Sequence, residues 1–401
     1  MFSIERFPFG RMTELLQYRR YALPFRTPMR TAHGPWKERA GVIVRREDAT
    51  GNVGYGEAAP IPGFGAEKLE DGIALLASLG NRVEVERLAE IPAGLACLRQ
   101  ALAAANPAEV REGAAKKDAV SPEYLPVAAL LPAGRAALAQ IAPKADAGFR
   151  VFKWKVGVGD LGDELALLDD LCAALPTGAR LRLDANGAWE RRQAERWLER
   201  CADRPIEHVE QPVASDARGS EDLLLGLAGD YPTPLALDES LVNEGDIERW
   251  LGAGWPGVFV VKPLLLADPA AALAKLAAAQ AKVVFSSALE TGIGARSALR
   301  LAFQWAEMMT RQKTAELNPS EGAKSAKAEN GAATSRSPDA TGRSRPQGNA
   351  SGHVRSGIPA LGFGVWPLFI DRRFDGPTAA PFVYRDDVER IDPEAIWTAL
   401  N

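Results

Sequence analysis

The sequence lacks the features that mark secreted, membrane-bound and nucleic-acid-binding proteins. Its three cysteines, Cys97, Cys172 and Cys201, are far apart and form no CxxC pair, which favours a reduced, cytoplasmic protein with small buried thiols. There is no uninterrupted run of about 18 apolar residues, so we expect no membrane span. Residues 1–12 carry charges where a signal peptide needs an apolar core. The net charge of −4 favours neither nucleic acid nor a membrane surface as a partner.

Large apolar residues are nearly absent from residues 311–356, which are rich in Ser, Ala, Gly, Asn and Pro. Such a composition cannot bury a core, so we predict a disordered insertion. Its basic charge is dilute, and we therefore do not expect it to tether nucleic acid or a partner. Near the N-terminus, Met12 is an alternative start that would make residues 1–11 a dispensable extension.

Residues 1–120 predict a small α+β domain. Two or three strands are expected over residues 14–57 and helices over residues 67–118, where apolar residues recur at helical spacing. Two polar segments, RTPMRTAHGPW and AAPIPGFGAE, are rich in turn formers and are candidate lid loops. His33 lies in the first of them and is interpreted as a solvated side chain. The tail, residues 366–401 with PFVYRDD, is predicted to return to this domain.

Residues 121–365 alternate between strand-like and helix-like segments. Seven such units are expected, from YLPVAALL and VFKWKV to AKVVFSS, and IPALGFGVWPLF supplies an eighth strand. Repeated strand–helix units of this length predict a parallel sheet closed by crossovers, which is a (β/α)-barrel of the α/β class.

Charged residues stand at the ends of five consecutive strands of this predicted barrel. Side chains alternate along a strand, so Lys153 and Lys155 point to the same side, although this pair alone is compatible with a solvated face. The next four strands end in Asp184, Glu210, Asp238 and Lys262. One acidic strand end is as readily a helix cap, but the whole set is not explained that way. Because barrel function gathers at the C-terminal strand ends, we expect the lysines of the second and sixth strands to face each other beside three carboxylates.

Three converging carboxylates repel one another unless a cation joins them. Hard oxygen ligands suit Mg²⁺, and a divalent ion takes up charge that develops on a substrate carboxylate when its α-proton leaves. Beside Lys153 and a metal ion, Lys155 should have a lowered pKa, because like charges and burial disfavour its ammonium form. A neutral lysine acts as a general base. The pattern therefore predicts proton abstraction next to a carboxylate, through an enediolate.

These strand ends resemble the enolase superfamily, in its muconate-lactonising branch, over nearly the whole chain except residues 1–11 and 311–356. The family pattern is a Lys-x-Lys strand, three single-carboxylate strands and a further lysine. The resemblance implies a modified TIM barrel with an α+β capping domain, whose loops are GYGEAAPIPGFG and RTPMRTAHG. It also implies Mg²⁺, with Mn²⁺ as a substitute, held by Asp184, Glu210 and Asp238, and a small carboxylate substrate.

Within the branch, the chain is most similar to the dehydratases of menaquinone and phylloquinone synthesis, because of Arg182 and the segment SSALETGIG. The resemblance implies loss of water from 2-succinyl-6-hydroxy-2,4-cyclohexadiene-1-carboxylate to give 2-succinylbenzoate. Lys155 would remove the α-proton and protonate the departing hydroxyl on the same face. Lys262 would be a cation on the other face, and Lys153 would hold and tune Lys155.

The same resemblance suggests further site residues. The succinyl carboxylate would be received at a helix N-terminus, where serines are as readily helix caps. The expected substrate-binding residues are Arg182, Ser286, Ser287 and Gly292, and the residues expected to support the metal ligands are Asn186 and Glu239.

Three other functions are compatible with parts of the pattern. Two opposed lysines also suit an N-acylamino-acid racemase, a dipeptide epimerase or a cycloisomerase of the same branch. Dipeptide epimerases carry an Asp-x-Asp on the last strand, whereas that strand reads ALGFGVW here. A non-catalytic binding protein on the same fold is disfavoured, because unused buried charges are costly.

Overall fold

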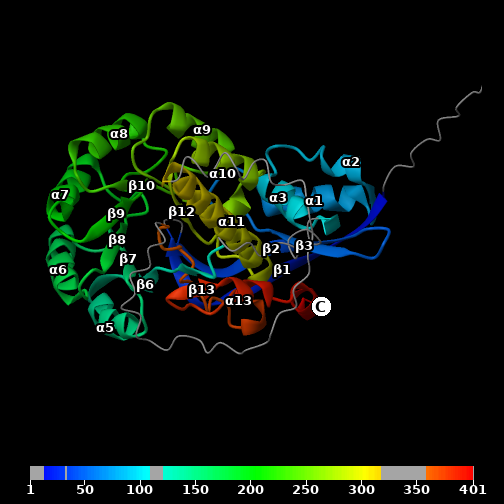
Figure 1. Ribbon diagram of the computed structural model, residues 1–401, viewed down its shortest axis with the longest axis horizontal. Coiled ribbons are helices and arrows are strands. Elements are labelled where there is room, and N and C mark those ends of the chain that lie inside the picture. The colour runs from blue at the N-terminus through cyan, green and yellow to red at the C-terminus, as the bar shows by residue number, and fades with distance from the viewer. Residues whose placement is uncertain (1–12, 32–33, 109–120, 318–357, 401) are drawn as a thin grey trace, which may run out of the picture.

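The computed structural model describes residues 13–31, 34–108, 121–317 and 358–400. Figure 1 shows two parts side by side: a parallel sheet ringed by helices, and an antiparallel sheet covered by helices α1 to α3. The parallel sheet has the strand order β12-β11-β10-β9-β8-β7-β6, and the antiparallel sheet has the order β3-β2-β1-β4. The predicted combination of a (β/α)-barrel with an α+β capping domain is confirmed.

The capping domain is built on a long hairpin. Its strands are β1 (Thr13–Thr31), β2 (Gly34–Glu47), β3 (Val53–Ala58) and β4 (Arg82–Glu84), and its helices are α1 (Leu69–Leu79), α2 (Val85–Leu88) and α3 (Ala96–Ala104). The prediction that RTPMRTAHGPW is a loop was wrong for most of the segment, because β1 and β2 continue through it to the pair Thr31↔Gly34. A register shift between Pro24 and Met29 lets the hairpin pass Pro28, which has no N–H to donate. His33 lies outside the described residues.

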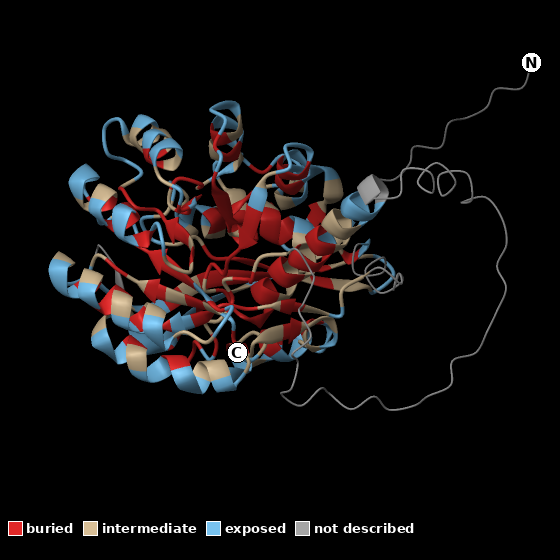
Figure 2. Cartoon of the chain, turned by 60° about the vertical axis from the view of Figure 1, so that its left-hand side comes forward, coloured by how far each residue is buried: buried red, intermediate tan, exposed pale blue. Residues whose placement is uncertain are grey.

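The barrel follows the predicted alternation of strands and helices. The strands are β6 (Ala129–Leu131), β7 (Val151–Lys155), β8 (Arg180–Asp184), β9 (Ile206–Glu210), β10 (Leu235–Leu237), β11 (Val258–Val261) and β12 (Lys282–Phe285). The helices are α5 (Leu138–Asp146), α6 (Leu161–Ala174), α7 (Arg191–Cys201), α8 (Ser220–Asp230), α9 (Glu244–Gly252), α10 (Pro269–Ala278) and α11 (Gly292–Leu317). Buried residues concentrate on the sheet and on the inner helix faces, whereas the outer helix faces are exposed (Figure 2).

The barrel is closed by two residues where a full eighth strand was predicted. In the described residues, IPALGFGVWPLF contributes only isolated bridges, Val127↔Leu361 and Ser286↔Gly362. The Ala128 N–H donates to the Leu361 carbonyl at 2.9 Å, and the Gly362 N–H donates to the Phe285 carbonyl at 2.7 Å. This short segment therefore joins the first and seventh barrel strands and completes the ring.

Two other predicted elements differ from the structure. YLPVAALL forms two strands, because β5 (Tyr124–Pro126) leaves the barrel and pairs with β13 (Phe382–Tyr384). Within the tail that is predicted to return to the N-terminal domain, PFVYRDD pairs with β5, whereas Phe369 bridges to Phe25 of β1. Residues 311–317 are part of α11 and not of a disordered insertion, since RQKTAEL consists mostly of good helix formers. Residues 318–357 lie outside the described residues.

The C-terminal segment contacts both parts of the molecule. It contains α13 (Arg385–Glu389) and α14 (Pro393–Ala399). The Arg19 guanidinium of β1 lies over the Trp397 ring of α14, with 4.3 Å between the guanidinium carbon and the ring centroid. The Arg26 N–H donates to the Leu368 carbonyl at 2.9 Å. None of the helices described is both long and apolar enough to cross a membrane.

Candidate active site

The charged strand ends meet at one mouth of the barrel, as predicted. On β7, Phe152 and Trp154 are fully buried in the packing against the outer helices, so Lys153 and Lys155 face the barrel interior. The register aligns Lys155 with Asp184 and Asp184 with Glu210. Lys153 Nζ lies 2.9 Å from Asp184 Oδ2 and donates to Glu210 Oε1 at 2.8 Å.

The two opposed lysines have different surroundings. Four strand steps separate β7 from β11 in the sheet order, which places Lys155 and Lys262 across the mouth from each other. Lys262 forms an ion pair with Asp238. Within the described part of the chain, Lys155 makes no hydrogen bond or ion pair. Lys155 is thus the site lysine whose amine is not already engaged by a carboxylate.

Burial and neighbouring charges shift the pKa values of several groups at the mouth. Burial raises the pKa of Glu210 to about 8; Lys153 opposes this rise, while Asp184 and Asp238 add to it. Burial and the neighbouring Asp238 raise the pKa of Glu239 to about 7. Burial lowers the pKa of Lys153, but the charges of Asp184 and Glu210 prevail and raise it above the usual value of lysine. Lys153 is therefore held as an ammonium that partly neutralises the acids.

The donor set fits a hard divalent cation in its chemistry. Asp184, Glu210 and Asp238 are buried, and the buried Oε2 of Glu239 has no hydrogen-bond donor. Among the described residues, no three acidic, histidine or cysteine side chains are already arranged to hold a metal ion. Lys153 and Lys262 contact the carboxylates instead.

Two polar residues fix the acidic strand ends. Asn186, in a left-handed conformation with φ 45°, donates from Nδ2 to Glu239 Oε1 at 3.0 Å. Gln211 follows Glu210 and was missed by the sequence analysis. Its Oε1 accepts the Asp238 N–H at 3.1 Å, and its Nε2 donates to Ser240 Oγ at 2.8 Å. The available signal in the sequence was an amide directly after a strand-end acid and before Pro212.

Arg182 does not reach the mouth. It is 1% exposed, and its Nε and Nη2 donate to the two carboxylate oxygens of Glu207 at 2.9 and 3.2 Å. A register shift between β8 and β9 turns Glu207 toward Arg182, where regular alternation would turn it away. The expected contact of Arg182 with substrate is therefore replaced by an ion pair beneath the site.

The predicted carboxylate-binding helix N-terminus is already filled. Glu57 of β3 accepts the Thr291 and Gly294 N–H groups at the start of α11, at 2.9 and 3.0 Å. A Cβ on Gly292 would lie 2.9 Å from the Asp375 carbonyl oxygen, so this glycine faces the C-terminal segment and not the mouth. Ser287 Oγ donates to Glu290 at 3.0 Å, whereas Ser286 bridges to Gly362 at the closure. Ser286 is buried, and its Oγ lies beside Gly362.

The capping loop AAPIPGFGAE does reach the mouth. Lys262 Nζ lies 4.6 Å from the centroid of the Phe64 ring. A Cβ on Gly65, which has φ +93°, would approach Val242 Cγ1 to 2.6 Å, so this loop is pressed against the barrel. Phe64 was not singled out from the sequence, because an aromatic residue in a Gly/Pro-rich loop gives no indication of its partner.

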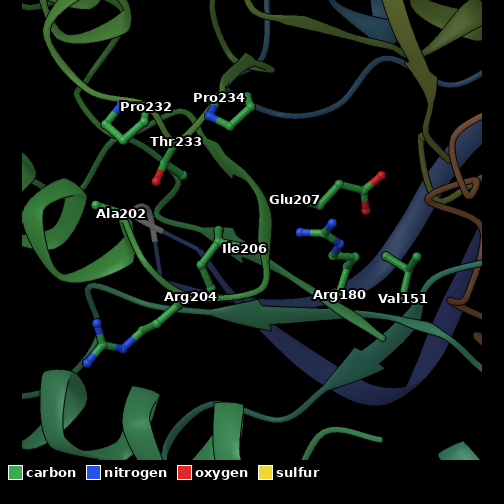
Figure 3. A pocket seen from close by; sticks show the side chains of 9 residues that line it. All are labelled: Val151, Arg180, Ala202, Arg204, Ile206, Glu207, Pro232, Thr233 and Pro234. Atoms are coloured by element: carbon green, nitrogen blue, oxygen red, sulfur yellow. The ribbon is translucent and has the colours of Figure 1, made fainter. Parts of the chain in front are cut away.

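A separate cavity of 520 Å³ lies at the other end of the barrel. Figure 3 shows that its lining includes Val151, Arg180 and Ile206, which are the first residues of β7, β8 and β9. Catalytic groups of barrels gather at the C-terminal strand ends, so this cavity is not the site.

Comparison with known proteins agrees with this geometry. The chain is 42% identical over 300 residues to an o-succinylbenzoate synthase of Thermosynechococcus vestitus, covering 72% of this chain and 88% of the relative. It is 29% identical over 258 residues to a hydrophobic dipeptide epimerase of Roseobacter litoralis, covering 58% and 70%. A crystal structure of o-succinylbenzoate synthase from Thermosynechococcus elongatus BP-1, complexed with Mg in the active site, is similar with a TM-score of 0.64 at 40% identity. It covers 73% of this chain and 90% of that chain.

The fold and the site define a barrel enzyme whose mouth is covered by a second, capping domain. Residues 136–340 match the family described as Enolase C-terminal domain-like. The chain belongs to this family and, with it, to the enolase superfamily.

Proposed function

We propose that this chain is an o-succinylbenzoate synthase: it removes water from 2-succinyl-6-hydroxy-2,4-cyclohexadiene-1-carboxylate and yields 2-succinylbenzoate. The observation that carries the proposal is the amine of Lys155, which has no partner among the described residues and lies opposite Lys262 and beside three buried carboxylates. The similarity to o-succinylbenzoate synthase extends over most of both chains. Such a reaction belongs to menaquinone or phylloquinone synthesis. The three cysteines, which are free thiols, support a reducing, cytoplasmic setting.

Lys155 performs both proton transfers. Its amine takes the proton from the carbon next to the substrate carboxylate, and the electron pair left behind expels the hydroxyl from the ring. The resulting ammonium protonates that hydroxyl, so water leaves and the ring becomes aromatic. Because one lysine acts twice, both groups leave from the same face of the ring.

The other residues stabilise the charge that this step creates. Asp184, Glu210 and Asp238 would hold Mg²⁺, or Mn²⁺ in its place, and the bound ion would stabilise negative charge on the substrate carboxylate. Lys262 presents its ammonium to the far face of the ring, on the side covered by Phe64. Lys153 keeps the acids close together through its contacts with Asp184 and Glu210.

Racemisation of N-succinylamino acids is the second candidate. The opposed pair Lys155 and Lys262 favours it, because a racemase needs a proton donor and an acceptor on opposite faces. A dipeptide epimerase is less consistent with the chain, because the closing segment around Leu361 and Gly362 carries no acid for a substrate amine.

One substrate comparison tests the proposal. Purified protein with Mg²⁺ should convert the cyclohexadiene carboxylate to an aromatic product, followed by ultraviolet absorbance, and should stop when the metal is chelated. A parallel reaction with N-succinylamino acids in D₂O measures racemisation by deuterium incorporation. Rapid racemisation without dehydration would replace the proposal by the racemase function.

A further inference from the structure

The Glu57 carboxylate belongs to the capping domain but accepts hydrogen bonds from the barrel. It is 1% exposed at the end of β3, and its donors come from a segment more than two hundred residues away. The Thr291 N–H donates to it at 2.9 Å and the Gly294 N–H at 3.0 Å, and the Thr291 hydroxyl donates as well. These groups form the first turn of α11, where an anion satisfies free N–H groups and the helix dipole.

Two neighbours in the capping sheet complete this contact. Tyr21 of β1 donates its hydroxyl to Glu57. The Tyr21 ring passes over Gly41 of β2, where a Cβ would overlap it, so the missing side chain lets Tyr21 reach β3. Arg39 of β2 is 1% exposed and donates to the carbonyls of Ala288 and Leu289 at 3.1 and 3.2 Å. The capping sheet therefore holds both the amides and the carbonyls of the segment after β12.

That segment follows the C-terminal end of β12, on the side of the barrel where the site lies, and its shape depends on these contacts. Residues 286–291 connect Ser286 at the barrel closure to the start of α11. Leu289 has φ 63°, a left-handed conformation that is unfavourable for a leucine unless its surroundings hold it. The Leu289 N–H donates to Ser287 Oγ at 2.9 Å, which fixes the turn internally. Glu57 and Arg39 fix it from outside.

We propose that Glu57 is a positioning residue of the reaction: together with Arg39 it sets residues 286–291 in the conformation that receives the substrate, so that seating of the capping domain and substrate affinity are coupled. This inference rests on the proposed dehydratase function. It predicts that loss of the Glu57 charge weakens substrate binding without loss of metal binding, since Glu57 contacts none of the predicted metal ligands.

The chain offers a control in Asp48. Its Oδ1 accepts the Thr50 and Asn52 N–H groups at 2.8 and 3.0 Å, in the turn between β2 and β3. This carboxylate also accepts backbone N–H groups, but it lies within the capping sheet, at the end of β3 opposite to Glu57. Asp48→Asn therefore removes a carboxylate without touching the contact between the two parts or the loop AAPIPGFGAE.

The experiment compares Glu57→Gln and Asp48→Asn in the full chain with Mg²⁺. We expect Glu57→Gln to raise KM for the cyclohexadiene substrate about tenfold, with a smaller change in kcat, because the charge is lost and one of the two oxygens that accept from buried donors becomes an amide NH₂. Asp48→Asn should leave KM unchanged. Mg²⁺ binding, measured by calorimetry, should be the same in both variants and in the wild type. Equal KM values in both variants would overturn the inference.

A second pair of variants serves if Glu57→Gln does not fold. Thr291→Val removes the hydroxyl that donates to Glu57, whereas Thr291→Ser keeps it. A KM that rises in Thr291→Val and returns in Thr291→Ser supports the coupling; unchanged KM in both overturns it. If the wild-type protein does not dehydrate the substrate, the proposed function itself is wrong. The variants test only the role of Glu57.

Discussion

Replacing Glu290 by glutamine should stabilise the protein above neutral pH. Glu290 is fully buried; its Oε2 accepts the Ala288 N–H at 2.6 Å and the Ser287 hydroxyl at 3.0 Å, but its buried Oε1 has no donor. Burial, with a smaller contribution from the charge of Glu57, raises the pKa of Glu290 to about 7. Arg39, from β2, is the nearby cation, and it donates to backbone carbonyls in this turn.

The sign and size of the effect follow from this pKa. The folded protein holds the Glu290 proton more tightly than the unfolded chain, so the free energy of unfolding falls as pH rises from about 4.5 toward 7. The rise in pKa from 4.5 to about 7 corresponds to about 3 kcal/mol, lost by the time the carboxyl is fully ionised. Glutamine keeps an acceptor for the Ala288 N–H and cannot ionise, so the variant escapes this loss.

Urea unfolding between about pH 4.5 and 8 measures the effect, with extrapolation to zero denaturant. The difference in stability between Glu290→Gln and the wild type should grow in favour of the variant across this range. Glu248→Gln, whose side chain is exposed beside Lys275, is the control and should follow the wild type. Parallel pH curves for Glu290→Gln and wild type would refute the assignment of a raised pKa to Glu290.

Three further predictions concern the lysine pair and the capping sheet. Lys155→Ala should abolish dehydration while Mg²⁺ binding persists, and near wild-type turnover would contradict the single-base mechanism. Lys262→Arg should retain part of the dehydration but no racemisation, because arginine keeps the charge yet cannot exchange a proton near neutral pH. Gly56→Ala should lower the free energy of unfolding by about 1–3 kcal/mol in urea, because its Cβ would overlap the Ala101 carbonyl of α3. Gly226→Ala, in an open position on α8, should cause no loss.

The sequence by itself determined the barrel and the charged residues at its mouth. Strand–helix alternation requires parallel strands, and parallel strands place their C-terminal ends on one side. Each strand-end residue was therefore assigned to the same mouth without knowledge of any contact. In the structure, Lys153 Nζ accordingly lies 2.9 Å from Asp184 Oδ2 and 2.8 Å from Glu210 Oε1.

Only the tertiary structure decided how the rest of the chain supports that mouth. The family resemblance implied that Arg182 binds substrate, yet a register shift between β8 and β9 supplies Glu207 as its partner. Glu57 looked like part of a lid loop, yet it caps a helix more than two hundred residues away. Local patterns specify which way a side chain points along its own element. Which distant group it meets depends on bulges, on domain packing and on the barrel closure at Leu361 and Gly362, and no local pattern encodes these.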